Sequence, residues 1–182
     1  MNNELIIEPA NFYCDEHIFD IDFHPSKDFI CCGTVEGNVK ILQYTQEDTV
    51  EVFSKEVNKT STRVCRFTYD GNGLITANSA GSIAFLDESG KVKVRMQKAF
   101  KNPIYSLLQL NENIIAAGDD DGQIKLFDIR NQQEVYSVHE QDAGTVSDMD
   151  VHSSMHYLLS TNTNGTLGVY DLRVENHQNE KK

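Results

Sequence analysis

The sequence lacks the features that mark several classes of protein. It has no stretch approaching the ~20 consecutive apolar residues that a membrane-spanning helix requires. The opening residues, MNNELIIEP, have no basic flank and only a short apolar core, so they do not have the form of a signal peptide. Tryptophan is absent, and proline never falls within a stretch that we expect to form a strand. We therefore expect neither a membrane span nor secretion.

Basic side chains are few. The 182 residues contain 16 Lys and Arg against 28 Asp and Glu, which gives a net charge of −12, and no run of Lys or Arg occurs. An anionic protein does not release counterions from phosphates, so we expect no sequence-independent binding of nucleic acid. The acidic balance favours basic proteins as partners.

The four cysteines form no Cys-x-x-Cys pair; they are Cys14, Cys31, Cys32 and Cys65. Adjacent residues of a strand face opposite ways, so Cys31 and Cys32 do not point toward the same ligand or partner. This usage fits a reduced cytosolic or nuclear protein better than a disulfide framework or a metal site.

The chain does contain an internal repeat. Residues 114–130 read IIAAGDDDGQIKLFDIR, in which an apolar run, a tight turn and an alternating run predict a β-hairpin. Similar hairpins recur at turn glycines separated by 44, 41 and 43 residues, namely Gly37, Gly81, Gly122 and Gly165. A period of ~40–45 residues with four strands per unit is typical of propeller blades. No helical period is sustained, so we predict an all-β protein.

The repeats predict four blades and two flanking segments. We expect an N-terminal segment at 1–17, blades at 18–57, 58–98, 99–138 and 139–174, and a polar tail at 175–182. Within the first segment, residues 5–7 form either a lone strand or a loose end. The fourth outer strand has to begin near Val174, where the sequence becomes polar, so we predict an incomplete fourth blade and an open ring.

An open ring leaves one face of blade one and one face of blade four without a neighbour. We predict that these faces expose alternating apolar residues and promote self-association. The residues expected there are Ile30, Val39 and Ile41 in blade one and Leu159, Leu167 and Val169 in blade four.

The end of each hairpin resembles the end of a WD repeat. The pattern Gly-x-φ-x-φ-φ-Asp closes the later repeats at Asp87, Asp128 and Asp171, with Leu, Phe or Tyr in place of the Trp of the family. The resemblance implies a WD-type β-propeller in which the turn glycines, these three aspartates and His139 are structural. In the family, a His, a strand Ser or Thr, a turn Asp and the Trp form a hydrogen-bonded set. The nearest match here is His139, Ser160, Asn164 and Tyr170.

The order of segments also resembles the first four blades of the WD repeat-containing protein 55 family. The pieces that carry the resemblance are Phe23-His24-Pro25, Lys98-Ala99 before Pro103 to Leu108, Gly118-Asp119-Asp120 and His139-Glu140. It implies a nucleolar, non-enzymatic scaffold associated with ribosomal RNA processing, without cofactor or metal. The family has seven blades and a basic tail, whereas four blades are recognisable here.

Two groups of charged residues are candidate sites for partners. Glu36 and the run Asp119-Asp120-Asp121 lie in hairpin turns, which share one face of a propeller, so we expect them to attract a basic partner. The consecutive Asp residues lack the alternate spacing of a calcium loop. We interpret them as a solvated turn whose side chains bond local amides. The sequence shows no nucleophile, base and orienting group in a catalytic motif, so we do not expect an enzyme.

The second group is Arg130 and Arg173, which close two consecutive repeats as aromatic-Asp-x-Arg. This is similar to the W-D-x-R motif of substrate receptors for cullin-4 ubiquitin ligases, in which the Arg contacts the ligase adaptor. The alternative is that each Arg pairs locally with its Asp. Three hypotheses follow: a scaffold in ribosome biogenesis, a ligase substrate receptor, and a truncated product without independent function.

Overall fold

The computed structural model describes residues 11–45, 48–139, 142–154 and 156–173. These residues form fifteen β-strands in four antiparallel sheets, which confirms the all-β prediction. No helix in the described residues could cross a membrane. The predicted strand at residues 5–7 and the fourth outer strand expected from Val174 lie outside the described residues.

Each sheet is one blade, in which strands adjacent in sequence are adjacent in space. Blade one comprises β1 (Ile18–Phe23), β2 (Phe29–Thr34), β3 (Asn38–Tyr44) and β4 (Thr49–Glu56). Blade two comprises β5 (Thr62–Phe67), β6 (Gly73–Asn78), β7 (Ile83–Asp87) and β8 (Val92–Met96). Blade three comprises β9 (Ile104–Gln109), β10 (Ile114–Asp119), β11 (Gln123–Asp128) and β12 (Gln133–His139). The described part of blade four comprises β13 (Val146–Val151), β14 (Tyr157–Asn162) and β15 (Leu167–Asp171).

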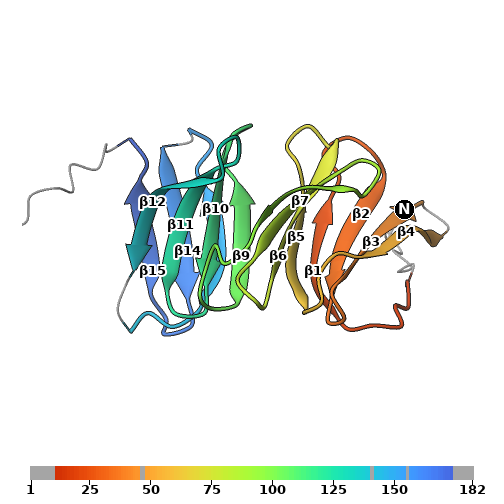
Figure 1. The fold of residues 1–182 in the computed structure, drawn as a ribbon, viewed down its shortest axis with the longest axis horizontal. Helices are drawn as coiled ribbons and strands as arrows, with labels where there is room; N and C mark the ends of the chain where they lie inside the picture. The colour runs from red at the N-terminus through yellow and green to blue at the C-terminus, as the bar shows by residue number, and fades with distance from the viewer. Residues whose placement is uncertain (1–10, 46–47, 140–141, 155, 174–182) are drawn as a thin grey trace, which may run out of the picture.

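The blades follow one another in sequence order, with blade one in orange at one end of the row and blades three and four in green to blue at the other (Figure 1). The substantial contacts between blades in the described residues join blade one to two, two to three and three to four, mainly through the inner strands β1, β5, β9 and β13. Blades one and four share no such contact. The four-bladed propeller is therefore an open one, as predicted.

The hydrophobic core lies between the blades, in three clusters that fill the three interfaces. The hairpins explain this arrangement, because each places apolar side chains six residues before and two and four residues after its turn glycine, on one face of the sheet. These triplets are Cys31, Val39 and Ile41; Ile75, Ile83 and Phe85; and Ala116, Ile124 and Leu126. Each of them packs against the blade that follows.

One sequence expectation about the free ends is wrong. Val39 is fully buried, and both Val39 and Ile41 pack in the cluster between blades one and two, so they do not face the open end. Alternation fixes which residues share a face of a strand but not which neighbour that face meets. At the open end of blade one, the apolar side chains on the other face of β1 are exposed instead, with Ile21 at 57% and Phe23 at 60%.

The expectation for blade four is accurate. Leu167 is 65% exposed and Val169 is 59% exposed, and Leu159 is half-buried on the same face. Exposed apolar side chains therefore occur at both ends of the row. At the blade-one end they are confined to β1, because Cys32, Lys40 and Leu42 on the same face are buried.

Candidate protein-interaction surface

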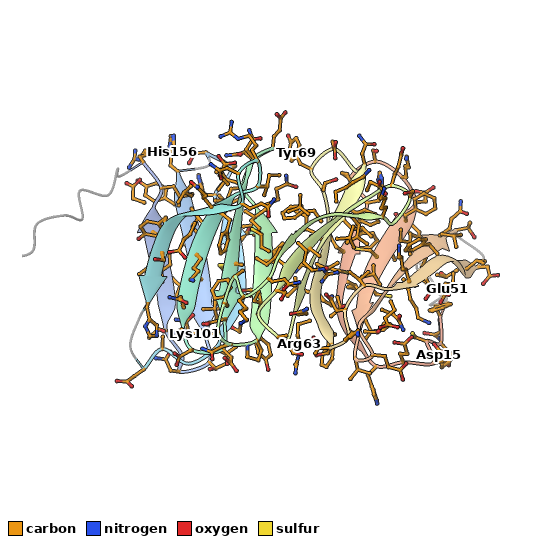
Figure 2. All side chains as sticks on the ribbon, in the orientation of Figure 1. Asp15, Glu51, Arg63, Tyr69, Lys101 and His156 are labelled. Atoms are coloured by element: carbon orange, nitrogen blue, oxygen red, sulfur yellow. The ribbon has the colours of Figure 1, made fainter. Side chains whose placement is uncertain are left out.

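The hairpin turns and the connections between blades share one face of the molecule. The N–H groups of Val57 and Asn58, in the connection to blade two, both donate to Gly37 O at 3.1 Å. In the next blade, Phe100 N donates to Gly81 O at 3.0 Å. We call this side the turn face. Figure 2 shows Arg63 and Lys101 toward this edge, and Tyr69 and His156 at the opposite edge.

Asp119 is a structural residue of its turn. It is only 1% exposed, and its Oδ1 accepts hydrogen bonds from Asp121 N at 3.0 Å and Gln123 N at 2.9 Å. In blade two, Asn78 occupies the same position and accepts from Ala80 N and Ser82 N in the same way. The expected bonding of Asp side chains to local amides is thus present for Asp119. Its burial removes it from the surface that a partner can contact.

Three of the predicted acidic residues are accessible on the turn face: Glu36 and Asp121 are exposed, and Asp120 is half-buried. We call these three residues the acidic rim. Burial raises the pKa of Asp120, and the neighbouring carboxylates of Asp119 and Asp121 raise it further. The charge of Arg63 acts in the opposite direction. The exposed carboxylates of the rim still give this part of the turn face a negative field, which favours a basic ligand.

Charge is not confined to the acidic rim. The connections on the turn face also carry exposed Lys59, Lys98 and Lys101, and exposed acidic residues occur on the opposite face at Glu88 and Glu112. The turn face is therefore not uniformly acidic, and the opposite face is not free of acidic side chains. A basic partner has to contact the rim locally.

His139 does not join the set expected from the WD-repeat resemblance. It is the last residue of β12 in blade three, and its Nε2 lies 2.9 Å from Asp121 O and 3.6 Å from a carboxylate oxygen of the same residue. Within blade four, Ser160 Oγ lies 3.4 Å from Tyr170 OH, and His139 takes no part in this contact. The contacts of this histidine are with the turn of its own blade.

The three aspartates that close the repeats begin turns on the opposite face. Asp87 Oδ1 accepts from Ser89 N at 3.0 Å and from Lys91 N at 2.9 Å. Asp128 and Asp171 accept from the amides of Arg130 and Arg173 at 2.9 and 3.0 Å. These side chains satisfy the amides of the turn, which is a structural role.

Arg130 and Arg173 pair locally in the same geometry. Each donates from Nε and Nη2 to the two carboxylate oxygens of the Asp two residues before it, at distances of 2.5 to 3.0 Å. The hydrogen bond and charge of Arg173 lower the pKa of Asp171 to about 2. Arg173 also donates to Tyr157 OH at 2.8 Å. The local pairing that the sequence left as an alternative is therefore present, and it occupies the bidentate edge that Nε and Nη2 form on each guanidinium.

His24 is a residue whose role the sequence did not reveal. It is 8% exposed, its Nδ1 accepts from Ser26 N and Lys27 N, and its Nε2 lies 3.1 Å from Gly71 O in the next blade. Its ring packs edge-on against Phe67 with centroids 4.9 Å apart. The position of His24 just before Pro25 predicts only a turn, and contact with a blade ~45 residues away cannot be inferred from local sequence.

Comparisons with known proteins agree with this geometry. Residues 10–42 match the family model described as WD domain, G-beta repeat. The chain is 34% identical over 168 residues to WD repeat-containing protein 55 of Bos taurus and 32% identical to that of Homo sapiens, covering 91% of this chain in each case. It is 31% identical to the homolog of Drosophila willistoni over 90% of the chain. The chain spans only 44% of the length of the two mammalian relatives and 32% of the insect one.

The fold also matches a solved structure. The computationally designed Ika4 protein superposes with a TM-score of 0.69 at 18% identity, covering 94% of this chain and 99% of the designed one. At that identity the match concerns the fold alone.

Proposed function

We propose that this chain, a WD-repeat protein with the fold of an open four-bladed β-propeller, is a non-enzymatic scaffold that binds basic proteins. WD domains generally mediate protein–protein interaction, and residues 10–42 match the model of one. The observation that carries the proposal is the turn face, where short exposed turns project from the blades, whose central strands are largely buried in blades one to three. A rigid scaffold that presents short loops suits recognition of another protein.

We further propose that the partners belong to ribosome biogenesis and ribosomal RNA processing, in the nucleus or nucleolus. The support is the similarity to WD repeat-containing protein 55 over 91% of the chain. The net charge of −12 agrees with partners that are themselves basic, as RNA-binding proteins of such complexes are. The cytoplasm is the alternative location.

A ligase receptor is not proposed as a second function. The pairing of Arg130 with Asp128 and of Arg173 with Asp171 accounts for both Arg residues by contacts within their own turns. The cullin-4 hypothesis therefore stays a prediction from sequence resemblance.

Identification of the proteins that co-purify with a tagged chain tests the proposal. We expect basic pre-ribosomal proteins, recovered above a tag-only control. The ligase reading predicts adaptor and cullin instead. Recovery of chaperones alone contradicts the scaffold proposal and favours a truncated product without independent function.

A further inference from the structure

The free ends of the row are complementary to one another. In blades one to three, the apolar triplet around the turn glycine packs against the next blade's inner strand. In blade four the same three positions are Leu159, Leu167 and Val169, and the last two are exposed. On inner strand β5, the residues that meet the triplet of blade one are Cys65 and Phe67.

The matching positions on β1 are exposed. Cys65 of β5 pairs with Thr76, which lies five residues before the turn glycine of blade two. Ile21 of β1 pairs with Cys32, which lies five residues before the turn glycine of blade one. Ile21 and Phe23 in blade one are therefore the equivalents of Cys65 and Phe67 in blade two. They are the two most exposed apolar residues of β1. An exposed apolar triplet and an exposed receiving strand thus lie at opposite ends of the described row of blades.

Polar contacts accompany the apolar contact between blades one and two. They come from the carboxylates of Asp20 and Asp22, and we call such a pair of carboxylates on an inner strand a clip. Asp20 Oδ2 accepts from Cys65 N at 3.0 Å and also pairs with the guanidinium of Arg66. Asp22 Oδ2 accepts from Phe67 N at 2.9 Å. Two carboxylates on one inner strand thus satisfy two backbone donors at the edge of the next, and such charge-assisted bonds are stronger than neutral ones.

Blade four, the last blade in the described residues, carries the same pair of carboxylates. Asp148 and Asp150 pair with Thr161 and Leu159, the same positions in the hairpin that Asp20 and Asp22 meet in blade one. Both are exposed. Their carboxylates accept from the amides of the residues that follow them, Met149 N at 2.9 Å and Val151 N at 2.8 Å.

Blade one has backbone N–H groups, those of Ile21 and Phe23, that can donate hydrogen bonds to such a pair of carboxylates. His24 N donates to Phe29 O, which places a bonded pair at that end of the ladder between β1 and β2. Bonded and non-bonded pairs alternate along an antiparallel ladder, so the N–H groups of Ile21 and Phe23 point away from β2. They correspond to the amides of Cys65 and Phe67, which blade one's own clip binds.

We propose that a second copy of this chain covers both free ends, with its blade one against blade four and its blade four against blade one. The clip of Asp148 and Asp150 then takes the amides of Ile21 and Phe23, and Leu167 and Val169 cover the side chains of those two residues. Each chain holds one acceptor face and one donor edge, so a two-fold axis satisfies both and closes a ring of eight blades. Propellers typically have about four to eight. The inference goes beyond the proposed function, because it concerns the ends of the row and not the acidic rim.

The mass in solution by size-exclusion chromatography with light scattering tests this proposal. The expected mass is twice the 20.6 kDa of the chain. Val169→Lys is expected to reduce it to that of one chain, since it places a charge in the apolar contact. Val135→Lys is the matched control, because Val135 is similarly exposed at 53% but lies on outer strand β12, and it is expected to leave the dimer intact. Melting curves show that both variants are folded.

Two further variants address the pairing itself. Asp148→Ala with Asp150→Ala is expected to weaken the dimer at least about tenfold, through the loss of two charge-assisted bonds per interface. Val169→Lys combined with Phe23→Glu is expected to restore the dimer that either change alone abolishes. A wild-type mass of one chain, a mass that grows without limit, or a dimer indifferent to Val169→Lys overturns the proposal. None of these outcomes affects recovery of basic partners at the acidic rim, so the two proposals fail separately.

Discussion

Replacement of Gly37 by alanine is expected to lower the free energy of unfolding by about 3 kcal/mol. Gly37 has φ +92, a region that costs an L-residue roughly 1–2 kcal/mol. A Cβ there would also lie 2.0 Å from Asn58 O in the connection to blade two. That atom is backbone, so the connection has to move, and such overpacking typically costs about 1–3 kcal/mol more.

Gly165 provides the matched control within the same chain. It occupies the same turn position with φ +89, but a Cβ on it meets nothing within 4 Å. Gly165→Ala is therefore expected to lose only the conformational part, about 1 kcal/mol. Urea unfolding of both variants separates the two contributions. Equal losses would mean that the connection does not press on the turn of blade one.

Replacement of Lys40 by methionine is expected to cost about 3 kcal/mol. Lys40 is 5% exposed, and its Nζ lies 2.8 Å from Asp15, 3.1 Å from Glu51 and 3.5 Å from Glu16. The side chain of Glu16 is only 8% exposed, so removing the cation leaves a buried carboxylate without its counter-charge. Breaking a buried pair costs about 3–5 kcal/mol, and the exposure of Asp15 places the effect at the low end.

The loss in this variant is expected to depend on pH. Burial raises the pKa of Glu16, but hydrogen bonds from Thr34 and Asn38 and the charge of Lys40 outweigh it, so the pKa lies below its ordinary 4.5. The stability that Glu16 contributes is therefore present above pH 4.5 and is lost as the pH falls through the lowered pKa. The difference between Lys40→Met and wild type should shrink in acid. Lys59→Met, at an exposed residue of a connection, is the control, and a loss as large in that variant would contradict this account.

The period of the turn glycines made the architecture predictable from the sequence. A glycine that must adopt positive φ is a local requirement, and Gly37, Gly81, Gly122 and Gly165 all have φ between 73° and 92°. Which neighbour each face meets was not predictable, because alternation is the same in either direction. For this reason the sequence predicts Val39 and Ile41 at the free end, although they pack against blade two.

The candidate site was predictable only in part. The three residues Asp119, Asp120 and Asp121 look alike in the sequence, yet Asp119 is buried and caps its turn. A signal was present, since the residue three before each turn glycine is a small hydrogen-bonding residue in all four blades, namely Thr34, Asn78, Asp119 and Asn162. The network around Lys40 had no such signal, because its partners come from strand β4 and from the segment before β1.

The most direct test of the scaffold proposal is the salt dependence of binding to a co-purified partner. The wild-type chain is compared with Glu36→Gln, Asp120→Asn and Asp121→Asn combined, which neutralises the acidic rim. The control is Asp28→Asn, Glu88→Gln and Glu112→Gln combined, which removes three exposed charges from the opposite face. Isothermal titration at low and high salt gives the affinity of each protein.

The proposal predicts that wild-type affinity falls as salt rises, since the attraction is between exposed charges. Neutralising the rim should weaken binding at low salt about tenfold and flatten the salt dependence, whereas the control should bind like wild type. Binding that is indifferent to salt and to the rim substitutions, or that is lost equally in the control, would contradict an interaction through the turn face.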